Sequence, residues 1–285
     1  MTQQPTIRLP ETGTDAGADE ITFIGTATTL IKVAGFTILT DPNFLHRGDR
    51  AYVGMGLSTK RLTEPAMSIE QLPPIDFVVL SHHHEDHFDR LVARNLDHGL
   101  PIVTEPPAAR KLRSQGFRSP IALSTWQSQV FMRGSVEVRV TSVPGKHAPR
   151  PLGYLVPPVM GSVLDFSRDG QRLLRLYITG DTLMHDGIDT IARRYPDLDM
   201  CLIHLGGTKI GGMLLTMDGR QGVQALRVIA PREAIPIHYD DYTLFKSPLA
   251  DFRQQAERAG LPVSIHYLAR GETYRLGVGV TGYQA

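Results

Sequence analysis

The sequence predicts an α/β protein in which two stacked β-sheets are flanked by helices, an αββα sandwich of two mixed sheets. Short runs rich in β-branched residues come first, and apolar runs that alternate with helical segments follow. No internal repeat, low-complexity block or change in composition divides the chain. We therefore expect an irregular leader over residues 1–19 and a single domain over residues 20–285.

Consecutive antiparallel strands are expected at the start of this domain. Their apolar runs cover residues 21–24, 29–33 and 36–40, with Gly25 and Gly35 between them. Residues 42–74 show little periodicity and predict a long loop with one short helix. Residues 75–80 form an almost continuous apolar run, which is typical of a buried strand.

Helices and strands alternate in the rest of the chain. Helical patterns cover residues 88–96, 106–115, 188–195, 218–229 and 247–260. Strands are expected over residues 130–132, 136–142, 153–156, 162–166, 173–179, 200–204, 234–238, 263–268 and 273–276. Gly99 and Gly116 lie where helix stop signals belong, and Asp218 is a typical helix N-cap.

Composition narrows the class of protein. Apolar residues make up 41% and charged residues 21%, and the formal net charge is +1, without the basic excess of a nucleic-acid binder. Cys201 is the only cysteine, so no disulfide can form within the chain. The sequence shows no signal peptide and no apolar stretch of the roughly 20 residues that span a bilayer. We expect a cytoplasmic protein, and a homo-oligomer is compatible with these features.

A histidine cluster directly follows the buried strand of residues 75–80. It reads Ser-His-His-His-Glu-Asp-His-Phe-Asp over residues 81–89. In an extended segment alternate side chains point the same way, so His82 and His84 can reach one metal ion together. Asp86 and His87 lie past a turn and can face a second ion. Imidazole and carboxylate ligands suit zinc first, with manganese or iron as alternatives.

The alternative interpretation of this cluster is a solvated polar loop or an accidental histidine run. Its position after a strand and the interleaved Asp86 argue against an accidental run. His83 and Glu85 point away from the proposed ions on this interpretation, and His83 is assigned either a packing role or a contact behind the ligands.

The cluster resembles the H-x-H-x-D-H motif of the metallo-β-lactamase superfamily. That family takes three further metal ligands from strand ends downstream, and each position has a match in this sequence. The matches are His147, Asp181 and His238. The resemblance implies that His82, His84 and His147 hold a first metal ion, that Asp86, His87 and His238 hold a second, and that Asp181 bridges both. It also implies that Asp41 supports the site from behind the ligands.

A second resemblance concerns the branch of the superfamily. Residues 24–30 and 38–42 resemble the opening of the branch that includes L-ascorbate-6-phosphate lactonase and N-acylphosphatidylethanolamine phospholipase D. Thr26 stands where members usually carry a histidine. Cys201 lies within an expected strand, so it is interpreted as a core residue and not as the cysteine ligand of some β-lactamases.

The resemblance implies hydrolysis by a hydroxide shared between two metal ions, with Asp86 orienting it. We expect a phosphodiester substrate, which can be lipid-like; a lactonase acting on a cyclic ester is the alternative. A metal-binding sensor or scaffold without catalysis is a third hypothesis. Cations near the motifs are weaker candidates for binding an anionic part of the substrate. They are Lys146, Arg150 and Lys209.

Overall fold

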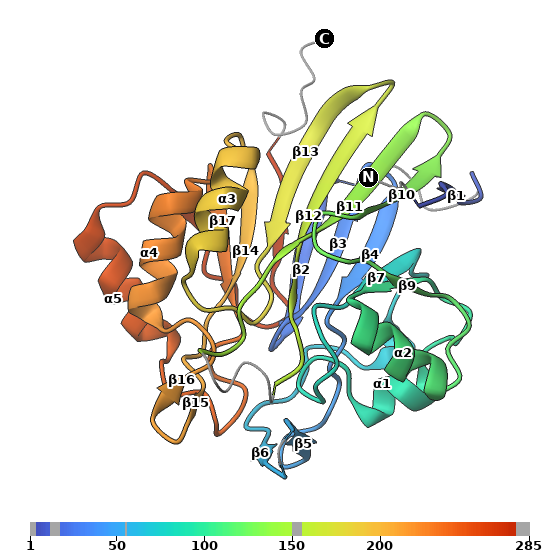
Figure 1. The fold of residues 1–285 in the computed structure, drawn as a ribbon. Helices are drawn as coiled ribbons and strands as arrows, with labels where there is room; N and C mark the ends of the chain where they lie inside the picture. Colours follow the sequence, from blue (N-terminus) through green and yellow to red (C-terminus); the bar gives the residue numbers. More distant parts are fainter. Residues whose placement is uncertain (1–3, 12–17, 55, 150–155, 278–285) are drawn as a thin grey trace.

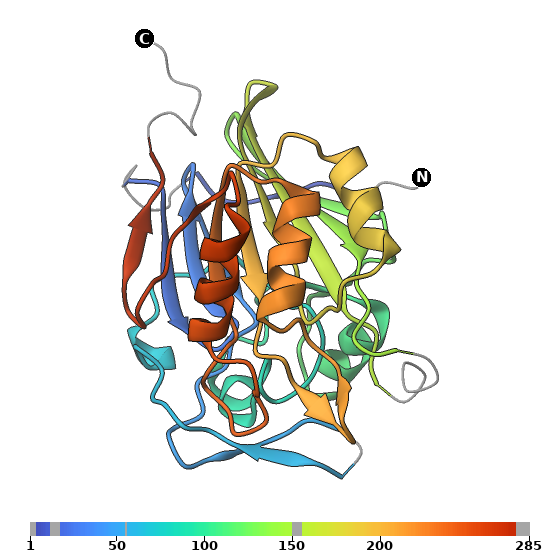
Figure 2. The same cartoon turned by 90° about the vertical axis from the view of Figure 1, so that its left-hand side faces the viewer.

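Two β-sheets packed face to face form the centre of the structure, a computed structural model that describes residues 4–11, 18–54, 56–149 and 156–277. Helices cover both outer faces (Figures 1 and 2). On one side lie α1 (Arg90–Asn95) and α2 (Pro106–Ser114). On the other side lie α3 (Asp186–Arg194), α4 (Gly219–Ile229) and α5 (Leu249–Ala259). The predicted αββα sandwich is confirmed. Residues 153–155 of one expected strand fall outside the described residues.

The first sheet has seven strands. In spatial order they are β19 (Thr273–Arg275), β2 (Glu20–Gly25), β3 (Thr28–Val33), β4 (Phe36–Thr40), β7 (Phe77–Val79), β8 (Ile102–Thr104) and β9 (Pro120–Ala122). Strands β2 to β4 are antiparallel, as expected, and β7 pairs parallel to β4. Strands β8 and β9 were not predicted, because three-residue strands are too short to show a periodicity.

The second sheet has eight strands. In spatial order they are β1 (Ile7–Arg8), β10 (Ser128–Arg133), β11 (Val136–Pro144), β12 (Met160–Arg168), β13 (Gln171–Ile178), β14 (Met200–His204), β17 (Glu233–Ile237) and β18 (Ser264–Ile265). The leader is therefore not irregular throughout, because β1 pairs parallel to β10. The Gln129 side-chain amide also donates a hydrogen bond to the Pro5 carbonyl, 2.9 Å away. A two-residue strand that is held by contacts from β10 shows no periodicity in the leader's own sequence, so it could not be predicted.

Two short ribbons and a 3₁₀ helix lie outside the two main sheets. The expected loop after β4 contains a two-stranded ribbon of β5 (Arg50–Tyr52) and β6 (Ser58–Lys60) and a 3₁₀ helix, η1 (Ile69–Gln71). A second unpredicted ribbon, β15 (Lys209–Ile210) and β16 (Met213–Leu214), precedes α4. Both ribbons lie at the lower end of the molecule in Figure 1. No helix within the described residues is long and apolar enough to cross a membrane.

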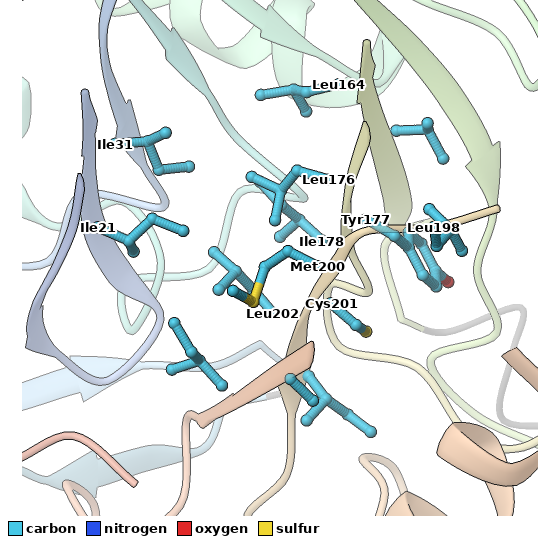
Figure 3. Close-up of a cluster of buried hydrophobic side chains, with 14 of the residues drawn as sticks. Ile21, Ile31, Leu164, Leu176, Tyr177, Ile178, Leu198, Met200, Cys201 and Leu202 are labelled. Atoms are coloured by element: carbon cyan, nitrogen blue, oxygen red, sulfur yellow. The ribbon is translucent and has the colours of Figure 1, made fainter. Parts of the chain in front are cut away.

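The main hydrophobic core fills the space between the sheets. The rings of Phe77 from one sheet and Phe131 from the other stack with centroids 3.9 Å apart. Figure 3 shows Met200 and Leu202 on the same side of β14 as Ile21 and Ile31 of the facing sheet. Cys201 alternates to the other face of β14 and is fully buried, as its core assignment requires. This packing holds the two sheets at a fixed separation, so the loops that leave them are fixed as well.

Several strands end at the same edge of the sandwich. Strands β13, β14 and β17 are parallel neighbours, and β4 is parallel to β7 in the facing sheet. Strand β11 runs in the same direction as β13, because each is antiparallel to β12. The loops after these strands therefore meet at one edge, which is where open α/β sheets commonly place their ligands.

Candidate metal centre

Three histidines form the first group of potential ligands at this edge. His82 and His84 follow β7, and His147 follows β11. The His82 Nε2 and His84 Nδ1 atoms are 3.0 Å apart, and all three residues offer nitrogen atoms within 4.8 Å of one another. The Ser81 hydroxyl lies 3.0 Å from His82 Nδ1 and so fixes the ring with Nε2 toward His84. The structure thus brings together the three residues assigned to one metal ion.

A second group combines two carboxylates with two histidines. Asp86, His87, Asp181 and His238 offer ligand atoms within 4.8 Å of one another. His87 Nε2 lies 3.2 Å from Asp181 Oδ2, and His238 Nε2 lies 3.8 Å from Asp86 Oδ2. His238 Nδ1 donates to the Leu205 carbonyl at 3.2 Å, which leaves Nε2 free for the site. The ring centroids of His82 and His87 are 4.2 Å apart, so the two groups of potential ligands are adjacent.

Asp41 connects this second group to the buried interior. It is 1% exposed, and its Oδ1 accepts a hydrogen bond from the Ser81 backbone N–H at 2.7 Å. Its Oδ2 lies 3.3 Å from His87 Nδ1 and 3.4 Å from His204 Nε2. A carboxylate behind a histidine fixes the ring orientation and makes the opposite nitrogen a better metal ligand. Asp41 therefore contacts His87 at the ring nitrogen that faces away from Asp181.

Sequence reasoning missed His204. It ends β14, so it stands at a strand end like Asp181 and His238, and that position was the signal that could have identified it. His204 is fully buried and shares the Asp41 carboxylate with His87. The Thr179 hydroxyl receives a hydrogen bond from the His204 backbone N–H at 2.9 Å. His204 therefore helps to hold Asp41, and through it His87, in place.

Burial and the carboxylates divide the histidines into two classes. Burial lowers the pKa of His84 to about 4, and it also lowers those of His82 and His147. Burial alone would lower the pKa of His87 as well, but the adjacent Asp181, Asp41 and Asp86 carboxylates outweigh it and hold that pKa well above 6.5. The histidines of the first group are thus neutral near pH 7 without metal, whereas His87 is protonated and lies between ionised carboxylates.

The buried polar atoms of the cluster test whether metal ions fit. Several of them have no hydrogen-bond partner. They are Asp86 Oδ1, His87 Nε2, His147 Nδ1, Asp181 Oδ1 and His238 Nε2. Unpartnered buried polar atoms are costly and rare, unless a ligand or ion completes them. Neutral imidazoles beside carboxylates are also the donor set that zinc, manganese and iron accept. The residues present therefore fit divalent cations.

Other predicted residues lie in different surroundings. His83 Nε2 lies 2.9 Å from Gln115 Oε1 and belongs to none of the ligand groups. Lys146 is exposed beside His147. Lys209 is exposed on β15 and lines a separate polar cavity with Lys246 and Asp251. Arg150 falls outside the described residues.

Thr26 takes part in the scaffold of the site. Its backbone is left-handed, with φ of 52°, and its N–H donates to Asp241 Oδ2 at 2.9 Å. Its carbonyl accepts a hydrogen bond from the His238 N–H at 2.6 Å. The residue that replaces the branch's usual histidine thus contacts a proposed ligand through its backbone.

The sequence and the fold both resemble known proteins. The family described as "Beta-lactamase superfamily domain" matches residues 33–239. A UPF0173 metal-dependent hydrolase of Methanopyrus kandleri is 25% identical over 89% of this chain and 98% of its own length. An N-acyl-phosphatidylethanolamine-hydrolyzing phospholipase D of Caenorhabditis elegans is 24% identical over 78% of this chain and 64% of its own. The isothiocyanate hydrolase from Delia radicum gut bacteria superposes with a TM-score of 0.78 at 20% identity, covering 90% of this chain and 99% of that one.

The chain belongs to the metallo-β-lactamase superfamily, because the family match spans most of its length. Its resemblance to the branch that includes N-acylphosphatidylethanolamine phospholipase D is likewise confirmed. Curated relatives are named metal-dependent hydrolases, and the candidate ligand groups lie at the expected strand ends.

Proposed function

We propose that this protein is a hydrolase with two divalent metal ions that cleaves a phosphodiester, with zinc as the first candidate metal. The observation that carries the proposal is the pair of adjoining ligand groups with their unpartnered buried atoms. His82, His84 and His147 would hold one ion, Asp86, His87 and His238 the other, and Asp181 both. When bound, two such cations lower the pKa of a water to about 7 and polarise the bond to be cleaved.

The chain's own residues would position the reactants. Asp86 is 5% exposed and its Oδ1 has no partner, so this oxygen can accept a hydrogen bond from the attacking water and orient it. Asp41 contacts the ring of His87, and the Ser81 hydroxyl contacts the ring of His82. Each contact fixes the orientation of a ring that would bind metal. The buried edge between the sheets restricts bulk water, which strengthens the electrostatic interactions there.

Two other hypotheses remain from the sequence. A lactonase would use the same groups, because hydrolysis of a cyclic ester also develops negative charge that bound cations would stabilise. A metal-binding sensor would use the ligands without turnover. The named function of the phospholipase D relative favours a phosphodiester that can be lipid-like.

An assay on purified, metal-loaded protein separates these hypotheses. We expect hydrolysis of bis-p-nitrophenyl phosphate, with slow or no hydrolysis of a lactone panel run in parallel. Elemental analysis should give two metal equivalents per chain. The variant Asp86→Asn serves as the test of the orienting oxygen, and Glu257→Gln, an exposed change on α5, serves as the control.

Activity on lactones alone would replace the phosphodiesterase proposal with the lactonase. Two bound equivalents without turnover of either substrate class would favour the sensor. Fewer than two equivalents in protein loaded with excess metal would contradict the ligand assignment.

A further inference from the structure

A cavity of about 410 Å³ opens beside the metal centre, within the range of roughly 300–1,000 Å³ typical of small-molecule sites. One wall is the proposed ligand segment, with His83, His84 and Glu85, and another is helix α2, whose end contacts His83 through Gln115. Pro107, Lys111 and Gln115 lie four residues apart and line the cavity from one helix face. Because His84 lines it, the cavity borders one of the residues that would hold the first metal ion.

Glu105 stands where α2 begins and also lines the cavity. It is 4% exposed, and its Oε1 accepts the Ala108 backbone N–H at 2.6 Å as the helix N-cap. The second oxygen, Oε2, is buried, has no hydrogen-bond partner, and belongs to a residue that lines the cavity. The N-cap role uses only one of the two oxygens, so it leaves Oε2 unexplained.

We propose that this cavity binds the apolar arm of an ester substrate, and that Glu105 Oε2, as a protonated carboxylic acid, donates a hydrogen bond to an oxygen acceptor on that arm. The proposal rests on the proposed hydrolase function, and it specifies the substrate class as esters with a short apolar arm that carries such an acceptor. The apolar surface comes from Tyr52, Pro107, Ala108 and Pro157. Glu105 is a substrate-binding residue in this proposal, because no proton leaves it during the reaction.

The electrostatic surroundings agree with a protonated acid. Burial raises the pKa of Glu105 to about 7, and the Ala108 N–H and Arg110 counteract only part of that rise. The other charged or titratable groups facing the cavity come from β5, from the ligand segment and from α2. They are Tyr52, His83, His84, Glu85 and Lys111. Burial lowers the pKa values of both His83 and His84.

Two substitutions separate substrate binding from helix capping. Glu105→Gln keeps the acceptor for the Ala108 N–H and supplies N–H donors in place of the acid. Glu105→Asp keeps a preferred N-cap side chain, but its carboxyl group is one methylene farther from the cavity. Glu257→Gln on the exposed face of α5 is the matched control.

The test is the binding of 2-hexanone, a neutral probe with a short apolar arm and a carbonyl acceptor but no donor, to metal-loaded protein by NMR titration. We expect wild-type affinity to fall about 3- to 10-fold as the pH rises from 6 to 8, the range expected for one lost hydrogen bond. Glu105→Gln should bind with little pH dependence, and Glu105→Asp should bind about 3- to 10-fold more weakly at pH 6 with an unchanged melting temperature. With a hydrolysed substrate, the same pattern should appear in KM and not in kcat.

Equal binding of 2-hexanone by wild type and Glu105→Asp, without pH dependence, would overturn the proposal and leave Glu105 as a helix cap alone. The expected binding pattern in a protein that hydrolyses no ester would support the pocket while removing the hydrolase function. The two failures are therefore distinguishable.

Discussion

Replacing Asp41 with asparagine removes the charge behind the second ligand group and preserves the backbone. Asp41 has φ of 34°, in the left-handed region, and asparagine tolerates that conformation as well as aspartate does. The shape of the side chain is also retained. Any effect of Asp41→Asn therefore comes from the lost carboxylate.

The structure gives the size of the expected effect. One carboxylate oxygen accepts the Ser81 N–H at 2.7 Å, and the other faces His87 Nδ1 at 3.3 Å and His204 Nε2 at 3.4 Å. Asparagine carries one oxygen and one N–H₂ donor in place of the two carboxylate oxygens. Either the Ser81 N–H or the ring nitrogens of His87 and His204 therefore lose their acceptor. Loss of such a charge-assisted bond behind a ligand lowers metal affinity by about 10- to 100-fold.

The same substitution affects the metal-free protein. Burial raises the pKa of Asp41, but His87 and His204 lower it more, so that it falls from 3.8 to about 2. This depressed pKa corresponds to stability on the order of 2 kcal/mol, which is present above pH 3.8 and is lost as the pH falls through 2. We expect Asp41→Asn to lose a similar amount at pH 7, where wild type is ionised.

Competition with a chelator measures the metal affinity, and urea unfolding in excess chelator measures the metal-free stability. His83→Ala is the matched control, because His83 lies in the same segment but contacts Gln115. It should retain wild-type metal content. Wild-type metal affinity in Asp41→Asn, or a lost metal equivalent in His83→Ala, would refute this account of the site.

Three other predictions follow from the same geometry. Asp181→Ala should abolish turnover and reduce metal content by at least one equivalent, because Asp181 lies beside His87 and His238; elemental analysis together with the phosphodiester assay checks both effects. Metal loading near pH 7 should release about one to two protons, because the pKa values of His87 and His238 are raised whereas those of the first group are lowered. Calorimetry in buffers of different ionisation enthalpy counts the released protons. Binding without proton release would contradict the ligand assignment. Phe131→Ala should lower the free energy of unfolding by about 3–5 kcal/mol, because it removes one of two stacked rings between the sheets; a urea midpoint close to wild type would show that the sheets pack independently of this contact.

Much of the site could be predicted from the sequence because its signals are local. The spacing of His82, His84, Asp86 and His87 is set within one short segment, and an extended backbone followed by a turn distributes those side chains in a defined way. His147, Asp181 and His238 each follow an apolar run, so the sequence also predicted that they lie at strand ends. The αββα architecture followed from the alternation of these runs with helical segments.

The tertiary structure alone decided which residues surround those ligands. Glu105 precedes Pro106 at the start of an expected helix, and only the packing of α2 against the ligand segment makes it part of a cavity lining with one unpartnered oxygen. His204 resembles the last residue of any strand until Asp41, 163 positions earlier, meets it across the two sheets. The physical reason is that ligand spacing depends on neighbouring backbone geometry, whereas burial, shared carboxylates and shifted pKa values arise from contacts between segments distant in the chain.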